Sequence, residues 1–218
     1  MTELVWYGLG CFRLAERGYP TVVTDPFEDG ETGLRGPRAA AEIVTCSRLI
    51  DDPIDVEWPG LRDVRYTVAG PGEYEIGGVF ITGVASPRSR KRGETVEQNV
   101  IYTISYRGVA ICHLGELGRP PTQKQVERIG RVNVLLVPVG IPGGLTPAMV
   151  SETISMIEPD VVVPMQYKTP GLKVERRPVH GFLKEMGVSH PETVSSLQAT
   201  SRGEPEDLQI LLLEPQER

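Results

Sequence analysis

The spacing of apolar residues changes character halfway along this chain, and that change limits the folds it can adopt. In the first half, short β-patterned runs are separated by Gly and Pro, which predicts a series of short strands. These runs are LVWYG, CFRLA, TVVTDPF, RYTVAG, VFITGVA, NVIYTISYRG and VAICHLGE. In NVIYTISY, the residues Ile101, Thr103 and Ser105 alternate with larger apolar residues, which predicts a half-buried strand.

Helical patterns alternate with strands in the second half. Residues 122–129 begin with a hydroxyl cap candidate and end before Gly130, so they predict a short amphipathic helix. Thr146 and Pro147 open another helix, and RPVHGFLKEMG predicts a third. The runs VNVLLVPVG, PDVVVPMQY and LQILLLEP predict strands between and after them. Strands first and strand–helix alternation afterwards predict an α+β or layered α/β fold, with two sheets and helices outside.

Composition narrows the classes of function. The chain has 218 residues, 39% of them hydrophobic, enough for one domain over residues 1–218 with a core that needs no disulfides. A net charge of -6 disfavours a nucleic-acid partner. No run is long enough to span a membrane, no signal peptide is recognised at the start, and the three cysteines are scattered. We therefore expect a reduced, cytoplasmic protein without a membrane partner.

Loops at the predicted strand ends carry recognisable motifs. The most specific are PGEYEIGG (71–78), HLGELG (113–118) and PMQYKTPG (164–171). On these motifs the chain resembles the metallo-β-lactamase superfamily, and within it the small branch of uncharacterised zinc-dependent hydrolases. The resemblance extends from about Trp6 to Leu183. It implies a four-layer αββα sandwich with a metal site at one edge of the two sheets.

The metal-binding residues of that family do not occur at the matching positions. Its leading motif, H-x-H-x-D-H, falls on SRLIDDP and therefore on Arg48, Ile50, Asp52 and Pro53, of which only Asp52 matches. The family's other ligand positions fall on Leu9, Arg88, Glu116 and Gln166. Zinc needs three or four nitrogen, sulfur or carboxylate ligands, and arginine cannot ligate because it keeps its proton. The resemblance therefore predicts a degenerate site with no metal and no other cofactor.

Arginines at former ligand positions can supply the positive charge that the metal would have brought. Arg48 and Arg88, facing Asp52 and Glu116, predict an ion-pair cluster, because guanidinium groups match carboxylates geometrically. We expect Arg48 within salt-bridge distance of Asp52 or Glu116. We also expect Gln166 to hydrogen-bond into the same cluster.

The resemblance places other residues near this site. Asp25, in the T-D-P turn, is expected to hold the neighbouring loop, while Tyr167 and Lys168 are expected to line the pocket. His113 precedes the family's G-D pair. The favoured interpretation is a histidine hydrogen-bonded at a strand end, and the alternative is a catalytic residue.

Three functional hypotheses follow from these residues. The leading one is a hydrolase-like, non-catalytic homologue that acts as a binding or scaffolding protein. Its partner would be an unknown small molecule or protein, and the chain itself is a candidate homo-oligomer. The alternative is a hydrolase in which Asp52, Glu116 and His113 hold a weakly bound metal or act as acid and base. A nucleic-acid-associated module rests on fold analogy alone. The basic run RSRKR (88–92) is interpreted as a solvated hairpin tip rather than an anion-binding patch.

Overall fold

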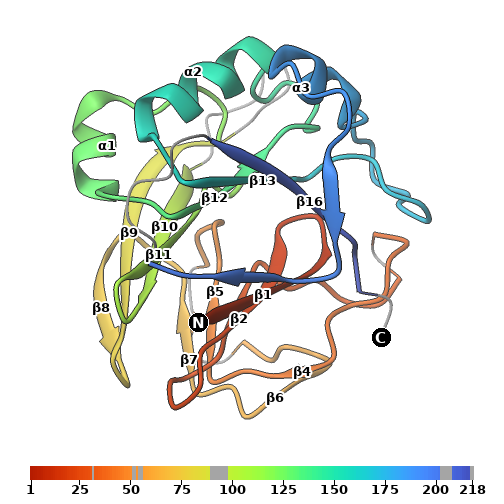
Figure 1. Cartoon of the computed structure of the whole chain (residues 1–218). Helices are drawn as coiled ribbons and strands as arrows, with labels where there is room; N and C mark the ends of the chain where they lie inside the picture. The colour runs from red at the N-terminus through yellow and green to blue at the C-terminus, as the bar shows by residue number, and fades with distance from the viewer. Residues whose placement is uncertain (31, 51–52, 54–55, 89–97, 202–207, 217–218) are drawn as a thin grey trace.

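Two mixed β-sheets pack face to face, with helices on the outer side of the second (Figure 1). The computed structural model describes residues 1–30, 32–50, 53, 56–88, 98–201 and 208–216. Within these residues the first sheet has six strands, in the order β15 (Leu197–Ala199), β1 (Thr2–Gly8), β2 (Cys11–Ala15), β3 (Val22–Thr24), β5 (Ile43–Thr45) and β7 (Tyr66–Val68).

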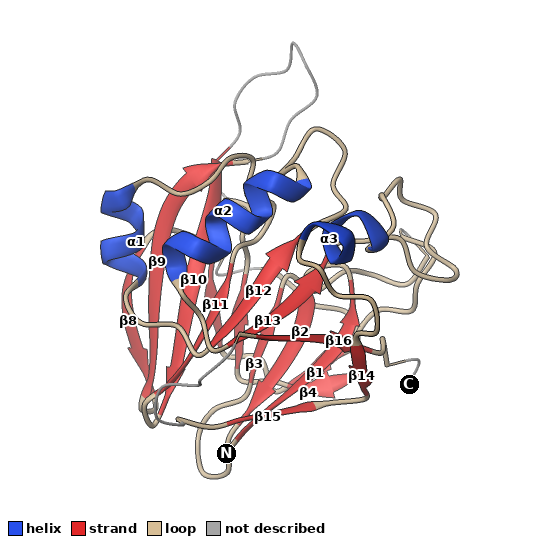
Figure 2. Cartoon of the chain, turned by 45° about the horizontal axis from the view of Figure 1, so that its top comes forward, coloured by secondary structure: helices blue, strands red, loops and turns tan. Residues whose placement is uncertain are grey.

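The second sheet is larger and carries the helices. Its eight described strands have the order β14 (Glu192–Val194), β16 (Gln209–Leu213), β13 (Val161–Met165), β12 (Val134–Pro138), β11 (Val109–His113), β10 (Gln98–Tyr106), β9 (Val79–Pro87) and β8 (Gly72–Ile76). The helices are α1 (Gln123–Ile129), α2 (Pro147–Ile157) and α3 (His180–Glu185). Figure 2 shows them together on one side of this sheet, and α1 contacts β9 and β10 while α2 contacts β12. The predicted layered α+β architecture is confirmed.

The outer face of the first sheet differs from the expected helical layer. Tyr7, Cys11 and Val23 point outward from it and pack against Ala39 and Ala41. Ala39 belongs to β4 (Ala39–Ala40), which pairs with β6 (Leu61–Arg62) in a small two-stranded sheet. In the part of the chain that the structure describes, loops and this small sheet therefore form the fourth layer.

Tyrosine hydroxyls tie the two sheets together through the main core. The Tyr106 hydroxyl, on β10, donates to the carbonyls of Leu14 (3.2 Å) and Pro20 (3.0 Å) on the side of the first sheet. The Tyr102 hydroxyl reaches the carbonyl of Val68 on β7 (3.2 Å). Both rings are fully buried, so their polar ends need such partners.

The prediction that NVIYTISY is half-buried was wrong. Strand β10 lies in the interior of the second sheet and is buried on both faces along most of its length. The polar face that suggested exposure lies under α1, where the Thr103 hydroxyl donates to the carbonyl of Ile129 (3.3 Å). The alternation of polar and apolar residues in β10 therefore marks a face that is covered by a helix, not a face exposed to solvent.

Local signals located the helices correctly. Thr122 caps α1 in a capping box with Gln125, and the helix ends at Gly130 as predicted. Thr146 caps α2, whose first residue is a proline. None of the described helices has the length and apolar character that a membrane span needs.

Strand ends gather at one edge of the sandwich. Strand β3 runs parallel to β5, and β11 runs parallel to β12, which in turn pairs with β13. Side chains that follow these strands are therefore brought together from distant parts of the sequence.

Candidate functional site

Three strand ends at this edge have an unusual backbone. Leu9, Asp25 and Gln166 are non-glycine residues with positive φ, at 51°, 38° and 58°. Such conformations cost an L-residue roughly 1–3 kcal/mol and persist only where the surrounding structure holds them. The carbonyl of Leu9 stabilises this arrangement, because it accepts hydrogen bonds from the Trp6 indole N–H (3.0 Å) and from the backbone N–H of Gln166 (3.2 Å).

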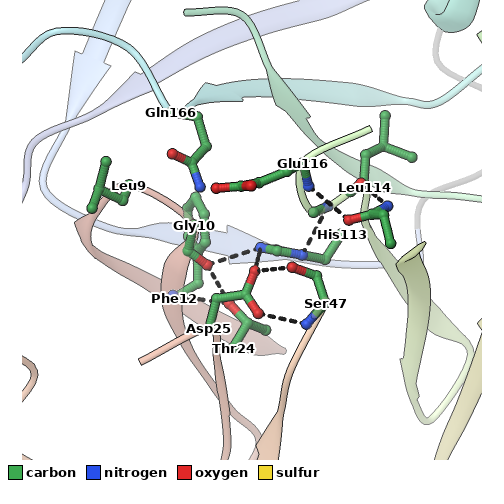
Figure 3. A network of polar contacts seen from close by, with 12 residues as sticks. Leu9, Gly10, Phe12, Thr24, Asp25, Ser47, His113, Leu114, Glu116 and Gln166 are labelled. Carbon is green, nitrogen blue, oxygen red and sulfur yellow. Dashed lines mark hydrogen bonds and ion pairs between the residues drawn. The ribbon is translucent and has the colours of Figure 1, made fainter. Parts of the chain in front are cut away.

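Asp25 joins the loop after β3 to the loop after β5. Its Oδ1 accepts a hydrogen bond from the Ser47 backbone N–H (2.6 Å), and its Oδ2 accepts one from the Ser47 hydroxyl (2.6 Å) (Figure 3). The Asp25 amide also donates to the carbonyl of Thr45 (2.8 Å). Asp25 therefore holds the start of the loop that follows β5.

His113, at the end of β11, is 1% exposed and contacts two backbone groups. Its Nε2 lies 2.8 Å from the carbonyl oxygen of Gly10, and its Nδ1 accepts from the N–H of Gly115 (3.2 Å). Since Nδ1 accepts, the ring proton is on Nε2, which donates to Gly10. The Asp25 carboxylate is 4.0 Å from Nε2. The geometry agrees with a hydrogen-bonded histidine at a strand end.

Glu116 lies between two guanidinium groups. Nε of Arg88 is 2.5 Å from Oε2, and Nη2 of Arg176 is 3.6 Å from Oε1. The main chain of Glu116 is held by Asn99, whose Oδ1 accepts from its N–H (2.8 Å). The side chains of Arg88, Arg176 and Glu116 are 21%, 11% and 18% exposed, so the cluster is mostly buried yet reaches solvent.

Gln166 belongs to the same cluster through Arg176. The Nε and Nη2 atoms of Arg176 donate to Oε1 of Gln166, at 3.1 and 2.9 Å. Burial lowers the pKa of Arg176, and the Arg88 cation acts in the same direction, while Glu116 opposes both. Gln166 therefore bonds into the ion-pair cluster as expected, but its partner is Arg176.

Close backbone approach at two glycines brings these groups together. A Cβ atom at Gly10 would lie 3.2 Å from Oδ2 of Asp25, 3.2 Å from Nε2 of Gln166 and 3.4 Å from Nε2 of His113. The polar atoms of three loops thus converge beside Gly10 (Figure 3). Gly115, the first glycine of the HLGELG motif, has φ 60°, and a Cβ atom there would clash with Ser47 and Asn99. Both the backbone conformation and the lack of space therefore require glycine at this position.

Some predicted site residues lie elsewhere. Arg48 is exposed, whereas Arg88 and Arg176 are in contact with Glu116. Ile50 is half-buried, and Pro53 lines another cavity of about 770 Å³ beside β7 and β8. Asp52, the partner that was also expected for Arg48, lies outside the described residues.

Tyr167 and Lys168 do not turn towards the cleft, the site formed by Gly10, Asp25, Glu116, Gln166 and Arg176. Tyr167 is 8% exposed and packs in the main core, with its ring centroid 5.2 Å from that of Trp6. Burial raises the pKa of Tyr167 to about 12. The ammonium group of Lys168 donates to the carbonyl of Leu172 in its own loop. The pocket-lining positions expected for both residues are therefore not observed.

Sequence reasoning missed three residues of this site. Arg176 follows the recognised PMQYKTPG motif on the loop that leads to α3, and no feature of the sequence marked its side chain for the cleft. Ser47 lies inside the matched loop but at a position without a family role. Asn99 orients Glu116 and also donates to the Ser86 hydroxyl (2.8 Å) and the Leu114 carbonyl (3.0 Å). A polar residue at the start of a long buried strand was the one available signal for Asn99.

Potential metal ligands do not gather in the described part of the chain. Within it, no three His, Cys, Asp or Glu side chains form a group that could hold a metal ion. The three cysteines are buried and unpaired by disulfides. Burial raises the pKa of the Cys46 thiol, with Asp25 as a further cause.

Comparisons with known proteins agree with the fold and with the motifs. A family model described as the beta-lactamase superfamily domain matches residues 3–166. A UPF0173 protein of Pyrococcus abyssi is 25% identical over 194 residues, covering 78% of this chain and 85% of that protein. A UPF0173 metal-dependent hydrolase of Methanopyrus kandleri is 24% identical and covers 99% of this chain and 98% of its own length.

A solved structure extends the similarity to three dimensions. A metallo-β-lactamase superfamily protein from Thermotoga maritima is 30% identical and superimposes with a TM-score of 0.76. The alignment covers 98% of this chain and all of the other. The strand-end loops, the two-sheet architecture and these matches together establish that the chain belongs to the metallo-β-lactamase superfamily.

Proposed function

We propose that this chain is a hydrolase-fold protein that has lost the zinc ligands of its family and acts as a metal-independent binding protein. The observation that carries this proposal is the pair of guanidinium groups on Glu116, contributed by Arg88 and Arg176. By the motif alignment, Glu116 stands where the family has its bridging aspartate. Arginine side chains thus pair with the carboxylate that would otherwise bind a metal ion.

The donor chemistry around Glu116 does not fit a zinc site of the family's type. Arg88 and Gln166 occupy positions where the family has histidines, and neither a guanidinium nor an amide nitrogen can bind zinc. Two guanidinium cations beside Glu116 would also repel a divalent ion. At about 4 Å, like charges near a protein surface repel by roughly 4 kcal/mol per unit-charge pair at an effective dielectric constant of 20.

The acid–base alternative has less support from the contacts. Both ring nitrogens of His113 are occupied by backbone groups, so the ring has no nitrogen free to take a proton from a substrate. Both oxygens of Glu116 face arginine guanidinium groups, so the carboxylate is already engaged in ion pairs. The relative from Methanopyrus kandleri is described as a metal-dependent hydrolase, and that description makes hydrolysis the activity to test.

Elemental analysis separates these possibilities directly. Protein purified without an affinity tag is incubated with zinc, iron or manganese and then dialysed. We expect well below one equivalent of each metal after dialysis. One full equivalent that is lost in both Asp52→Ala and Glu116→Gln variants would overturn the proposal.

Hydrolysis assays complete the test. A chromogenic lactam, a phosphodiester and a thioester should all be hydrolysed at the background rate, since no bound metal generates hydroxide at neutral pH. Turnover that a chelator abolishes would contradict the proposal. Turnover that survives the chelator but disappears in Glu116→Gln would favour the acid–base alternative instead.

A further inference from the structure

We infer that this cleft binds an oxyanion, a carboxylate or phosphate group of a small molecule, through Arg176 and the side-chain amide of Gln166. The inference deepens the proposed function and rests on it, because a divalent metal would compete for the same space. It follows from an amide donor of Gln166 that no described residue accepts from, an incompletely neutralised cation and a route to solvent.

The unpartnered donor is Nε2 of Gln166. The side chain is 4% exposed, and Arg176 fixes the orientation of the amide by donating twice to Oε1. Nε2 must then point away from Arg176, and it lies near the position that a Cβ of Gly10 would occupy. No residue that the structure describes accepts a hydrogen bond from it. Nε2 is not one of the enclosed, unpartnered polar atoms of the described residues, so it is reached by solvent and can donate to the oxygen of a ligand that displaces water there.

The incompletely neutralised cation is Arg176. Its contact with Glu116, at 3.6 Å, is longer than a hydrogen bond, so the carboxylate attracts the guanidinium without saturating its N–H groups. The same carboxylate also faces Arg88 at 2.5 Å. The nearby carboxylate of Asp25 accepts two hydrogen bonds from Ser47, which partly compensate its charge. Negative charge from a ligand would therefore complete the pairing of Arg176.

These donors select one ligand chemistry. A guanidinium and an amide presented side by side match the oxygens of a carboxylate or phosphate, and charge-assisted hydrogen bonds of this kind are among the strongest in proteins. The charged side chains of the cluster retain between 11% and 21% exposure, so a small solute can reach them. A neutral or cationic ligand would leave both donors of the cleft without a matching charge.

Titration with two simple anions tests the inference and identifies the source of the oxyanion. Chelator-treated full-length protein is titrated with sodium phosphate or sodium acetate against sodium chloride at equal ionic strength, by calorimetry and by thermal unfolding. We expect a saturable rise in Tm with at least one of the two, about 3–6 °C at ten times Kd, and none with chloride. A response to phosphate alone assigns a phosphorylated ligand, and a response to acetate alone assigns a carboxylate.

Two variants link the response to the cleft. Gln166→Glu keeps an oxygen for Arg176 but replaces the Nε2 donor with a negatively charged acceptor, so the protein should fold and its affinity for the anion should fall at least tenfold. Arg176→Gln should also lose the response. Lys173→Gln removes an exposed charge from the same loop and should retain it.

Each outcome decides the matter. The absence of any anion response beyond chloride in the wild type would overturn the inference, and so would an unchanged affinity in Gln166→Glu. If Arg176→Gln does not fold, Gln166→Glu alone still gives the answer. If the protein binds neither metal nor anions, only this inference is contradicted. If the elemental analysis finds a full equivalent of zinc, the proposed function is contradicted.

Discussion

The ion pair between Arg88 and Glu116 should stabilise the folded protein far more than an exposed pair of similar geometry. Exposed pairs contribute about 0–1 kcal/mol, and breaking a fully buried pair costs about 3–5 kcal/mol. Here the Nε–Oε2 distance is 2.5 Å and the two side chains are 21% and 18% exposed, so the pair lies between these limits. We expect a coupling energy of about 2 kcal/mol, in the range of a hydrogen bond between charged groups.

A double-mutant cycle measures this coupling. Urea unfolding is followed for the wild type, Arg88→Gln, Glu116→Gln and the double variant, because the cycle separates the pair from the other contacts of each residue. For a chain of this length, 2 kcal/mol corresponds to a Tm change of about 4–8 °C. The matched control is the pair between Arg38 and Asp29, whose atoms lie 2.9 Å apart but whose side chains are 66% and 54% exposed.

The comparison with this control decides whether the cleft cations matter to folding. The control cycle should show no measurable coupling, and the coupling of Arg88 with Glu116 should change little between 0.05 and 0.5 M salt, roughly the range over which exposed pairs become screened. Equal couplings in the two cycles, or a cleft coupling that vanishes with salt, would refute the reasoning. The cluster would then be an ordinary solvated contact.

Four further outcomes are expected. Gly10→Ala places a methyl group 3.2 Å from two polar atoms of the cleft, so urea unfolding should show a loss of about 1–3 kcal/mol, together with loss of the anion response. Burial raises the pKa values of Cys11, Cys46 and Cys112, so a thiol reagent at pH 8 should label none of them until the protein is unfolded. As pH rises, these thiols ionise in the unfolded chain before they ionise in the folded protein, because their pKa values are higher when folded. The free energy of unfolding should therefore fall above about pH 8.5 by about 1.4 kcal/mol per pH unit for each thiol, until the native pKa is reached, which is about 12 for Cys112. Urea unfolding at pH 8 and at pH 10 measures this fall. Tyr106→Phe leaves the buried carbonyl of Leu14 and the partly buried carbonyl of Pro20 without this donor and should cost about 1–3 kcal/mol in the same urea assay.

Local side-chain patterns predicted most of the secondary structure. The caps at Thr122 and Thr146 and the apolar runs of β12 and β13 depend on neighbouring residues alone, and the structure agrees with each. The strand β8 was missed because the sequence PGEYEIGG was interpreted as a loop motif between two strands. The exposure expected for one face of β10 was wrong because a covering helix is not visible in the sequence of the strand itself.

Motif positions predicted where polar groups would gather, but not which of them would meet. Leu9, Asp25, Glu116 and Gln166 lie at the sheet edge where the motif alignment placed them. The identity of the second cation on Glu116 did not follow from the motif, since Arg176 approaches from a loop outside it.

The sequence by itself determined the change from strands to strand–helix alternation and the absence of histidine at the matched ligand positions. These properties are carried by single residues and by local periodicity, so they can be recognised without knowing the fold. Only the tertiary structure decided that Arg88 and Arg176 share Glu116, that Arg48 is exposed and that Arg176 fixes the side-chain amide of Gln166. Long side chains reach several neighbours, and the loops that meet at a sheet edge are set by the pairing of distant strands.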